Sequence, residues 1–202
     1  RNWEQIRTSV CYNEANVKIA STHAGISVGA DGATHQSIED IALMLSLPNM
    51  TVISPCDYFE AQKATVAASK INRPCYLRYS RLPTPIITNQ KDRFEVGKAN
   101  IIKKGKDVTI FCHGIMVHQS IKAQLQMQKT IDAEIINVHT HRPLDNATIL
   151  KSLKKTGQAI VAEEAVESGS LFGAIAQVSA KNYPCPIQPV ALGSFGESGD
   201  PE

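Results

Sequence analysis

Short apolar runs alternate with segments of helical periodicity along the whole chain, and this alternation restricts the possible folds more than any other feature of the sequence. The apolar runs predict strands at residues 17–20, 51–53, 75–77, 98–103, 107–112, 133–138, 159–162 and 187–191. The periodic segments predict helices at residues 3–10, 38–45, 58–70, 115–129, 147–155 and 171–180. Such alternation is typical of α/β proteins, so we predict two mainly parallel sheets with covering helices.

A break in this alternation divides the chain into two units. Residues 80–90 contain two prolines and show no periodicity, as expected of a link between domains. We therefore predict a first unit over residues 1–85, a linker over residues 86–96 and a second unit over residues 97–202.

Three short patterns predict local details. Ser37 and Asp40 have the spacing of a capping box at the start of a helix, and Asp57 is placed to cap the next one. The turn at residues 104–106 predicts that the strands on either side of it are neighbours in their sheet.

The charge and cysteine patterns exclude several classes of function. The formal net charge is only +2 and the charges are interspersed, so nucleic acid is not an expected partner. The sequence has no signal peptide and no apolar run of the roughly 20 residues that span a membrane, which predicts a cytoplasmic protein without a membrane partner. The five cysteines lie far apart without a C-x-x-C pair, as expected of free thiols in a reducing compartment.

Both ends of the sequence look like interruptions of a longer chain. Residues 3–10 are in helical register at once, with no initiator methionine or N-cap before them. The ending Gly-Asp-Pro-Glu at residues 199–202 is typical of a loop that leads into another element. We expect a piece of a larger protein.

The strongest candidate for a site is the loop at residues 22–36, which follows the first predicted strand. Ligands of open α/β sheets bind outside the carboxyl ends of strands. The loop has glycines at positions 25, 29 and 32, and it carries titratable or hydrogen-bonding side chains on His23, Asp31, His35 and Gln36. From the residues alone, a plain surface loop is the favoured alternative.

Arginines surround the third predicted strand. Arg73, Arg78 and Arg81 are suited to bidentate capture of a phosphate at the end of that strand. Exposed arginines that only solvate the strand are the alternative, because such residues are common.

The second unit offers weaker candidates. His139 and His141 have the spacing of two rings on one face of a strand, but no further ligand stands nearby, so we predict no metal site. Glu163 and Glu164 are predicted to end a strand, where they form either a functional pair or two exposed carboxylates.

Residues 25–36 read GISVGADGATHQ and closely resemble the pyrimidine domain of transketolases, in which a histidine, a G-x-D-G segment and T-H-Q recur in this order. Further matches, at residues 3–7, 22–23, 47–52, 105–110 and 195–199, extend the resemblance over nearly the whole chain. The sequence is most similar to the carboxyl-terminal section of split transketolases, in which a partial pyrimidine-binding domain is followed by a transketolase C-terminal domain.

The resemblance implies transfer of a two-carbon ketol unit from a ketose phosphate to an aldose phosphate, with thiamine diphosphate and magnesium in the assembled enzyme. By the same resemblance, His23 helps to hold substrate phosphate or hydroxyls, and Asp31 binds a sugar hydroxyl. His35 lies beside the aminopyrimidine of the cofactor and assists proton movements, while Arg81 grips the substrate phosphate.

The resemblance also implies that the chain does not work alone. In the family, the glutamate that activates the cofactor lies upstream of Trp3, and the ligands of diphosphate and magnesium belong to a separate amino-terminal section. We therefore expect no cofactor binding and no activity without that partner, and we expect a second copy of this chain in the assembly. Ala165 stands where a histidine often follows the paired glutamates, which weakens any catalytic role of the second unit.

Two alternatives remain. Deoxyxylulose phosphate synthases share the G-A-D-G and T-H-Q segments and the Gly-Asp-Pro-Glu ending, but they usually carry an acidic-basic pair in place of Thr22 and His23. They also use pyruvate, which offers no sugar hydroxyls to Asp31. The other alternative is a non-catalytic module that only dimerises and holds another subunit.

Overall fold

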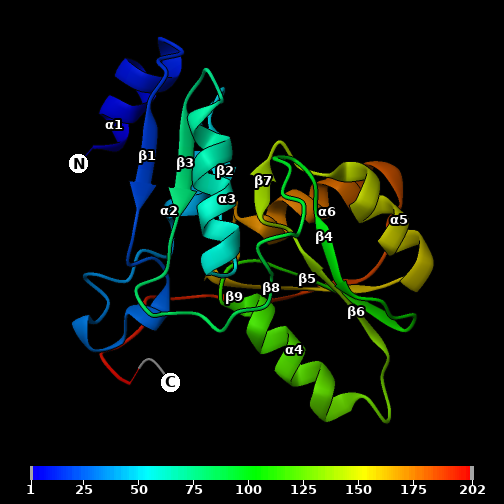
Figure 1. Ribbon diagram of the computed structural model, residues 1–202. Coiled ribbons are helices and arrows are strands. Elements are labelled where there is room, and N and C mark those ends of the chain that lie inside the picture. Colours follow the sequence, from blue (N-terminus) through cyan, green and yellow to red (C-terminus); the bar gives the residue numbers. More distant parts are fainter. Residues whose placement is uncertain (1, 201–202) are drawn as a thin grey trace.

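Two mixed, mainly parallel sheets with covering helices form the protein (Figure 1). This computed structural model describes residues 2–200, so Arg1 and the last two residues of the Gly-Asp-Pro-Glu ending lie outside the described part. The predicted α/β class is confirmed, since all but two of the strand pairs are parallel.

The first sheet takes three strands from the first unit and one from the second. Its order is β1-β3-β2-β7, formed by β1 (Lys18–Ser21), β3 (Cys75–Arg78), β2 (Thr51–Ile53) and β7 (Thr140–Arg142). The first three strands are mutually parallel, whereas β7 runs antiparallel to β2. The sequence did not predict β7, because three residues are too few to show a period.

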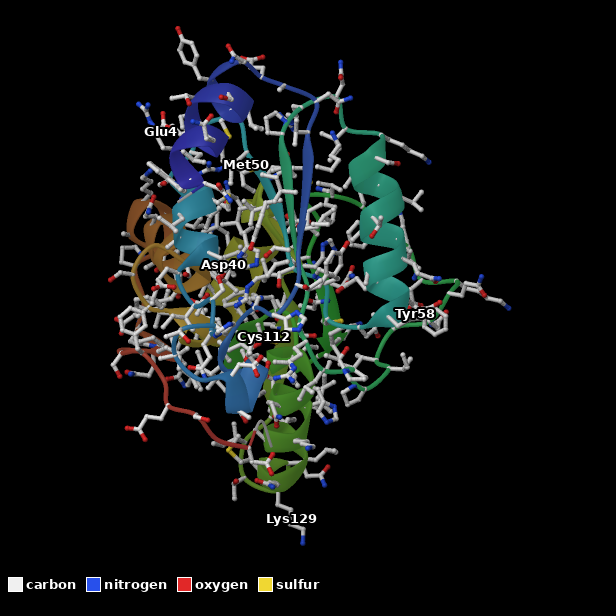
Figure 2. The ribbon with its side chains drawn as sticks, turned by 90° about the vertical axis from the view of Figure 1, so that its left-hand side faces the viewer. Glu4, Asp40, Met50, Tyr58, Cys112 and Lys129 are labelled. Carbon is white, nitrogen blue, oxygen red and sulfur yellow. The ribbon has the colours of Figure 1, made fainter. Side chains whose placement is uncertain are left out.

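Helices cover both faces of this sheet. Figure 2 shows α1 (Trp3–Gln5) and α2 (Asp40–Leu45) on one side of the strands and α3 (Tyr58–Ser69) on the other. A π-helical segment (Ile6–Tyr12) continues α1. One apolar core lies on each side, with Met50 and Val52 in the first and Ile53, Ala64 and Leu77 in the second.

The second sheet has the order β4-β6-β5-β8-β9. Its strands are β4 (Asn100–Lys103), β5 (Val108–Cys112), β6 (Ala133–Asn137), β8 (Ala159–Val166) and β9 (Ile187–Leu192). One face packs against α4 (Met116–Met127), and the other packs against α5 (Asn146–Thr156) and α6 (Leu171–Asn182) (Figure 1). Only β4 is antiparallel to its neighbour.

The predicted pairing of β4 with β5 is wrong, because β6 lies between them. The segment that joins them instead packs against the start of β6, where Lys106 and Asp107 both donate their backbone N–H to Asp132. A side chain at Gly105 would meet the Ala133 carbonyl carbon at 2.2 Å. The glycine therefore permits a close approach of two backbones rather than a hairpin turn.

One predicted helix cap is confirmed and the other is wrong. The Asp57 carboxylate accepts a hydrogen bond from the backbone N–H of Glu60, as an N-cap does. Ser37 does not cap α2, which begins at Asp40 without a side-chain cap. The Asp40 carboxylate is committed elsewhere, to Arg78 at 2.9 Å and to the Tyr76 hydroxyl at 2.7 Å.

Asp57 also fastens the segment between the two units. Residues 79–99 form no helix or strand. The Asp57 carboxylate accepts from the backbone N–H of Ile87 at 2.8 Å and from both the backbone N–H and the hydroxyl of Thr88. One buried carboxylate therefore both starts α3 and holds the linker against the first unit.

Buried polar contacts join the two units. The Asn137 side-chain amide donates to both oxygens of Glu60, at 2.9 and 3.0 Å. Ser54 bonds His113 through its hydroxyl and the His139 carbonyl through its N–H. Each of these five residues is buried, so the units pack as one body.

Two predictions from composition can be compared directly with the structure. All five cysteines are free thiols, as predicted, and four of them are buried. No helix among residues 2–200 has both the length and the apolar character needed to cross a membrane.

The capping and linker contacts of Asp57 yield a test of stability. We expect Asp57→Ala to lower the free energy of unfolding by roughly 2–4 kcal/mol, because four donors lose a charged acceptor in a buried place. Denaturant unfolding measures this change. Asp92→Ala is the control, since Asp92 bonds Asn89 in the same local manner but is exposed. Equal losses in the two variants would contradict the assignment.

Candidate functional site

The segment with the candidate side chains forms a closed loop at the carboxyl end of β1. We call residues 25–36 the glycine-rich loop. Its base is tied by the Gly25 N–H, which donates to the Ser37 carbonyl at 2.7 Å, and by the Ala24 N–H, which donates to the Tyr79 carbonyl at 3.3 Å. Loops with joined ends pack on themselves and often carry function. The fold therefore presents this loop beside the carboxyl end of β3, where Arg81 follows.

Asp31 and Arg81 are brought together by the structure. Arg81 Nη1 lies 3.3 Å from Asp31 Oδ2 and donates to the Val28 carbonyl at 2.5 Å. Both side chains remain more than a third exposed. An ion pair of this kind adds at most about 1 kcal/mol to stability, so it is easily exchanged for a ligand.

The two candidate histidines lie just before and within the glycine-rich loop, and both are exposed. Nδ1 of His23 lies 2.9 Å from the Thr22 hydroxyl, and Nδ1 of His35 lies 2.9 Å from the Thr34 hydroxyl. Each threonine therefore orients the imidazole that follows it. His23 has a φ of 61°, which is uncommon for a residue other than glycine.

The three arginines do not form one cluster. Arg73 precedes β3 and Arg81 follows it, so they lie at opposite ends of the strand. Arg78 is buried and paired with Asp40, and it also donates to the Glu164 carbonyl at 3.0 Å. Of the three, only Arg81 stands both exposed and next to the glycine-rich loop.

Three of the four histidines of the second unit are packing residues, and the fourth, His118, is half-buried in α4. His139 stacks on Phe94 with ring centroids 4.3 Å apart, and His141 meets His113 edge to face at 4.4 Å. All three rings are buried. Residues 2–200 contain no group of three His, Cys, Asp or Glu side chains that could hold a metal ion.

Burial keeps these imidazoles neutral. It lowers the pKa of His113 to about 3, with a further lowering by the nearby Arg78 guanidinium. It also lowers the pKa of His139 and, well below the usual range, that of His141. The His113 ring and the Glu163 carboxylate lie 3.6 Å apart, but at neutral pH they do not form an ion pair.

The expectation that Glu163 and Glu164 end a strand is wrong. The strand β8 continues to Val166, and both carboxylates are buried within it. Glu163 accepts from the backbone N–H groups of Leu171 and Phe172 at the start of α6. Burial raises the pKa of each carboxyl group, and hydrogen bonds from backbone N–H groups oppose this.

Glu164 reaches the glycine-rich loop instead. Its carboxylate accepts from both the backbone N–H and the hydroxyl of Ser27, each at 3.1 Å. Adjacent residues of a strand point to opposite faces, so one glutamate serves α6 and the other serves the loop. This alternation could have indicated from the sequence that the two glutamates point to opposite faces. The predicted strand ended at residue 162, before both glutamates, so the alternation was not applied to them.

The segment after β9 also contacts the glycine-rich loop. The Ser198 hydroxyl donates to the Ala30 carbonyl at 2.6 Å. The Gln36 side-chain amide donates to the Glu197 carbonyl at 3.1 Å. No local sequence pattern indicates a role for Ser198 or Glu197, because they lie 168 and 161 positions from their partners.

Comparison with known proteins identifies the family. The family model of the transketolase pyrimidine binding domain matches residues 1–85, and that of the transketolase C-terminal domain matches residues 97–202. The chain belongs to the transketolase family. Both transketolase units are therefore represented in one chain of 202 residues.

Individual relatives agree with this assignment. A 6-deoxy-6-sulfo-D-fructose transketolase subunit of Clostridium sp. (strain MSTE9) is 37% identical over 97% of this chain and 62% of its own length. A putative transketolase C-terminal section of Methanocaldococcus jannaschii is 40% identical over 90% of this chain and 58% of its own length. The chain therefore spans about three fifths of the length of these curated relatives.

A solved structure supports the fold assignment. It is described as a split gene transketolase, inactive beta4 tetramer, and it superposes with a TM-score of 0.89 at 37% identity. The match covers 96% of this chain and 63% of that one. The arrangement of the two transketolase units is therefore shared with a solved member of the family.

The buried histidines yield a test of pH dependence. The unfolded chain binds a proton on each of them near pH 6.5, whereas the folded chain keeps them neutral. Their contribution to stability therefore falls as the pH decreases below this value, by about 1.4 kcal/mol per pH unit for each histidine. The raised pKa values of Glu163 and Glu164 act in the opposite direction, since their stabilisation is lost as the pH rises.

We expect His113→Asn to reduce the slope of unfolding free energy against pH by about 1.4 kcal/mol per pH unit between roughly pH 4 and 6. Asparagine can still bond the Ser54 hydroxyl but does not titrate. Denaturant unfolding at a series of pH values measures the slope. A slope equal to that of the unsubstituted chain would show that His113 already binds a proton in the folded state.

Proposed function

We propose that this chain supplies the substrate-binding wall of a transketolase that moves a two-carbon ketol unit from a ketose phosphate to an aldose phosphate. The observation that carries the proposal is the exposed pair formed by Asp31, on the glycine-rich loop of a transketolase-family chain, and Arg81, which follows β3. A carboxylate next to a guanidinium offers an acceptor for sugar hydroxyls and a donor for phosphate at one place.

Arg81 is assigned to the substrate phosphate. A guanidinium presents its N–H groups in a planar fork that matches a phosphate, and a hydrogen bond to a charged group contributes roughly 1.5–3 kcal/mol. When phosphate engages Arg81, the Asp31 carboxylate loses its cation and becomes available to a sugar hydroxyl. His23, at the end of β1, is assigned to the same end of the substrate.

His35 is assigned to proton transfer. An imidazole can both give and accept a proton. Because Nδ1 of His35 bonds the Thr34 hydroxyl, Nε2 is the nitrogen left for exchange with the substrate. We place this nitrogen beside the reacting sugar and the aminopyrimidine of the cofactor.

Members of the transketolase family generally use thiamine diphosphate and a divalent metal ion. When bound, thiamine diphosphate supplies the carbon nucleophile that carries the ketol unit. We assign only the pyrimidine end of the cofactor to this chain, at His35, and residues 2–200 contain no three-ligand group for the metal. We therefore place the diphosphate and magnesium ligands, and the activating glutamate, on an amino-terminal section.

This division of labour implies a heteromer that is inactive when this chain is alone. Two relatives are named as transketolase subunits, and one of them, from the apulose-4-phosphate transketolase of Phocaeicola vulgatus, is 32% identical over 95% of this chain. The solved relative is a tetramer of one kind of subunit. We propose an assembly of amino-terminal sections with at least two copies of this chain, acting on sugar phosphates in the cytoplasm.

The assembled enzyme tests the proposal. The full subunit, its amino-terminal partner, thiamine diphosphate and magnesium are mixed and assayed for ketol transfer from xylulose phosphate to ribose phosphate. We expect turnover only in the mixture. Condensation of pyruvate with glyceraldehyde phosphate would instead indicate a deoxyxylulose phosphate synthase, and no turnover of either kind would favour a non-catalytic module.

In the same assay, we expect Arg81→Ala to raise the KM for phosphorylated sugars by roughly 10–100-fold, which corresponds to the loss of one charged hydrogen bond. The KM for unphosphorylated sugars should change much less. Arg93→Ala is the matched control, because Arg93 also forms an exposed ion pair, with Glu95 at 2.7 Å, but lies in the linker. A similar effect of the two substitutions would contradict the role of Arg81.

A further inference from the structure

Three hydrogen-bonded contacts from the second unit hold the glycine-rich loop, which belongs to the first unit. Glu164 of β8 accepts from the backbone N–H and the hydroxyl of Ser27. Ser198 and Glu197, after β9, bond the Ala30 carbonyl and the Gln36 side chain. Among the described residues, β8 and the segment after β9 each contribute two hydrogen bonds to this loop, more than any other part of the second unit.

These contacts flank the proposed site residues along the chain. Ala30 directly precedes Asp31, and Gln36 directly follows His35. Ser27 adjoins Val28, whose carbonyl accepts from Arg81. A shift in any of these three contacts would therefore also move a residue that we assign to substrate binding or proton transfer.

Of the three contacts, the one made by Glu164 is the best shielded from water. Glu164 and Ser27 are both 6% exposed, so the two hydrogen bonds are shielded from water. A charged acceptor roughly doubles the strength of a hydrogen bond. The backbone of Glu164 is itself held, because Arg78 donates to its carbonyl oxygen at 3.0 Å. The carboxylate therefore projects from a fixed strand into the loop.

The loop has a glycine where this carboxylate passes. A Cβ added at Gly25 would lie 2.2 Å from Glu164 Cδ, far inside any real contact. Gly25 also has a φ of +82°, which side chains rarely adopt. Both the space and the backbone conformation at Gly25 are thus matched to the approach of Glu164.

We propose that Glu164 is a positioning residue that sets Asp31 and His35 through Ser27, so that the second unit acts on the site without touching substrate. Its catalytic consequence rests on the function proposed above, whereas the ordering of the loop does not. The contact gives the second unit a role in ordering the site. This role differs from direct catalysis, for which the sequence gives weaker support because Ala165 stands where the family often has a histidine. Contacts that merely join the units, such as Glu60 with Asn137, would not order the loop.

The variants are chosen by hydrogen-bonding capacity. Glu164→Ala removes both bonds, and Ser27→Ala removes only the bond to the hydroxyl. Glu164→Gln can keep both, since its carbonyl can accept from the Ser27 N–H while its amide donates to the Ser27 hydroxyl. Glu60→Gln is the matched control, because Glu60 is an equally buried glutamate at the contact between the units, away from the loop.

The first measurement is amide hydrogen exchange of the full subunit. We expect Glu164→Ala to speed exchange over residues 25–37 by roughly tenfold or more, with Ser27→Ala intermediate and Glu164→Gln close to the unsubstituted subunit. Glu60→Gln should leave this segment unchanged. Unchanged loop exchange in Glu164→Ala, or an equal increase in Glu60→Gln, would overturn the proposal.

The second measurement is steady-state ketol transfer by the assembled holoenzyme. We expect Glu164→Ala to lower kcat and to raise the sugar phosphate KM, with kcat/KM reduced by roughly tenfold or more, and Glu164→Gln to restore most of it. Glu164→Ala with faster loop exchange but unchanged kcat and KM would refute its effect on the site. Absence of turnover in the unsubstituted assembly would refute the proposed function alone, because hydrogen exchange would still report on the loop.

Discussion

The buried ion pair between Arg78 and Asp40 is the interaction on which the other parts of the structure converge. Arg78 ends β3, and Asp40 begins α2. The same guanidinium donates to the Ser37 carbonyl, at the base of the glycine-rich loop, and to the Glu164 carbonyl of the second unit. One side chain thus links the first sheet, a covering helix, the site loop and the second unit.

Such a buried ion pair fixes the relative positions of these parts more than it adds to the free energy of unfolding. Removing two charges from water costs free energy that their attraction barely recovers, so a buried pair needs hydrogen bonds on its remaining atoms. Here the Tyr76 hydroxyl and two backbone carbonyls supply them. A displaced Arg78 would leave the buried Asp40 carboxylate without its cation and the Glu164 carbonyl without the guanidinium donor, which disfavours other placements of the loop relative to the second unit.

In the function that we propose, the two units share one site rather than dividing into a catalytic and an accessory part. The side chains assigned to substrate, among them Asp31 and Arg81, come from the first unit. The groups that order their loop, Glu164 and the segment after β9, come from the second.

The sequence by itself determined the α/β class, nearly every strand and helix, the Asp57 cap and the loop that carries His23, Asp31 and His35, because these depend on local periodicity and residue type. Only the tertiary structure decided which arginine lies exposed beside the glycine-rich loop, that β6 separates β4 from β5, and which carboxylates are buried. Those outcomes depend on contacts between residues far apart in the chain. A local sequence pattern does not indicate which distant residue will be the partner, because the free energy that favours one partner over another arises only when the sheets pack together.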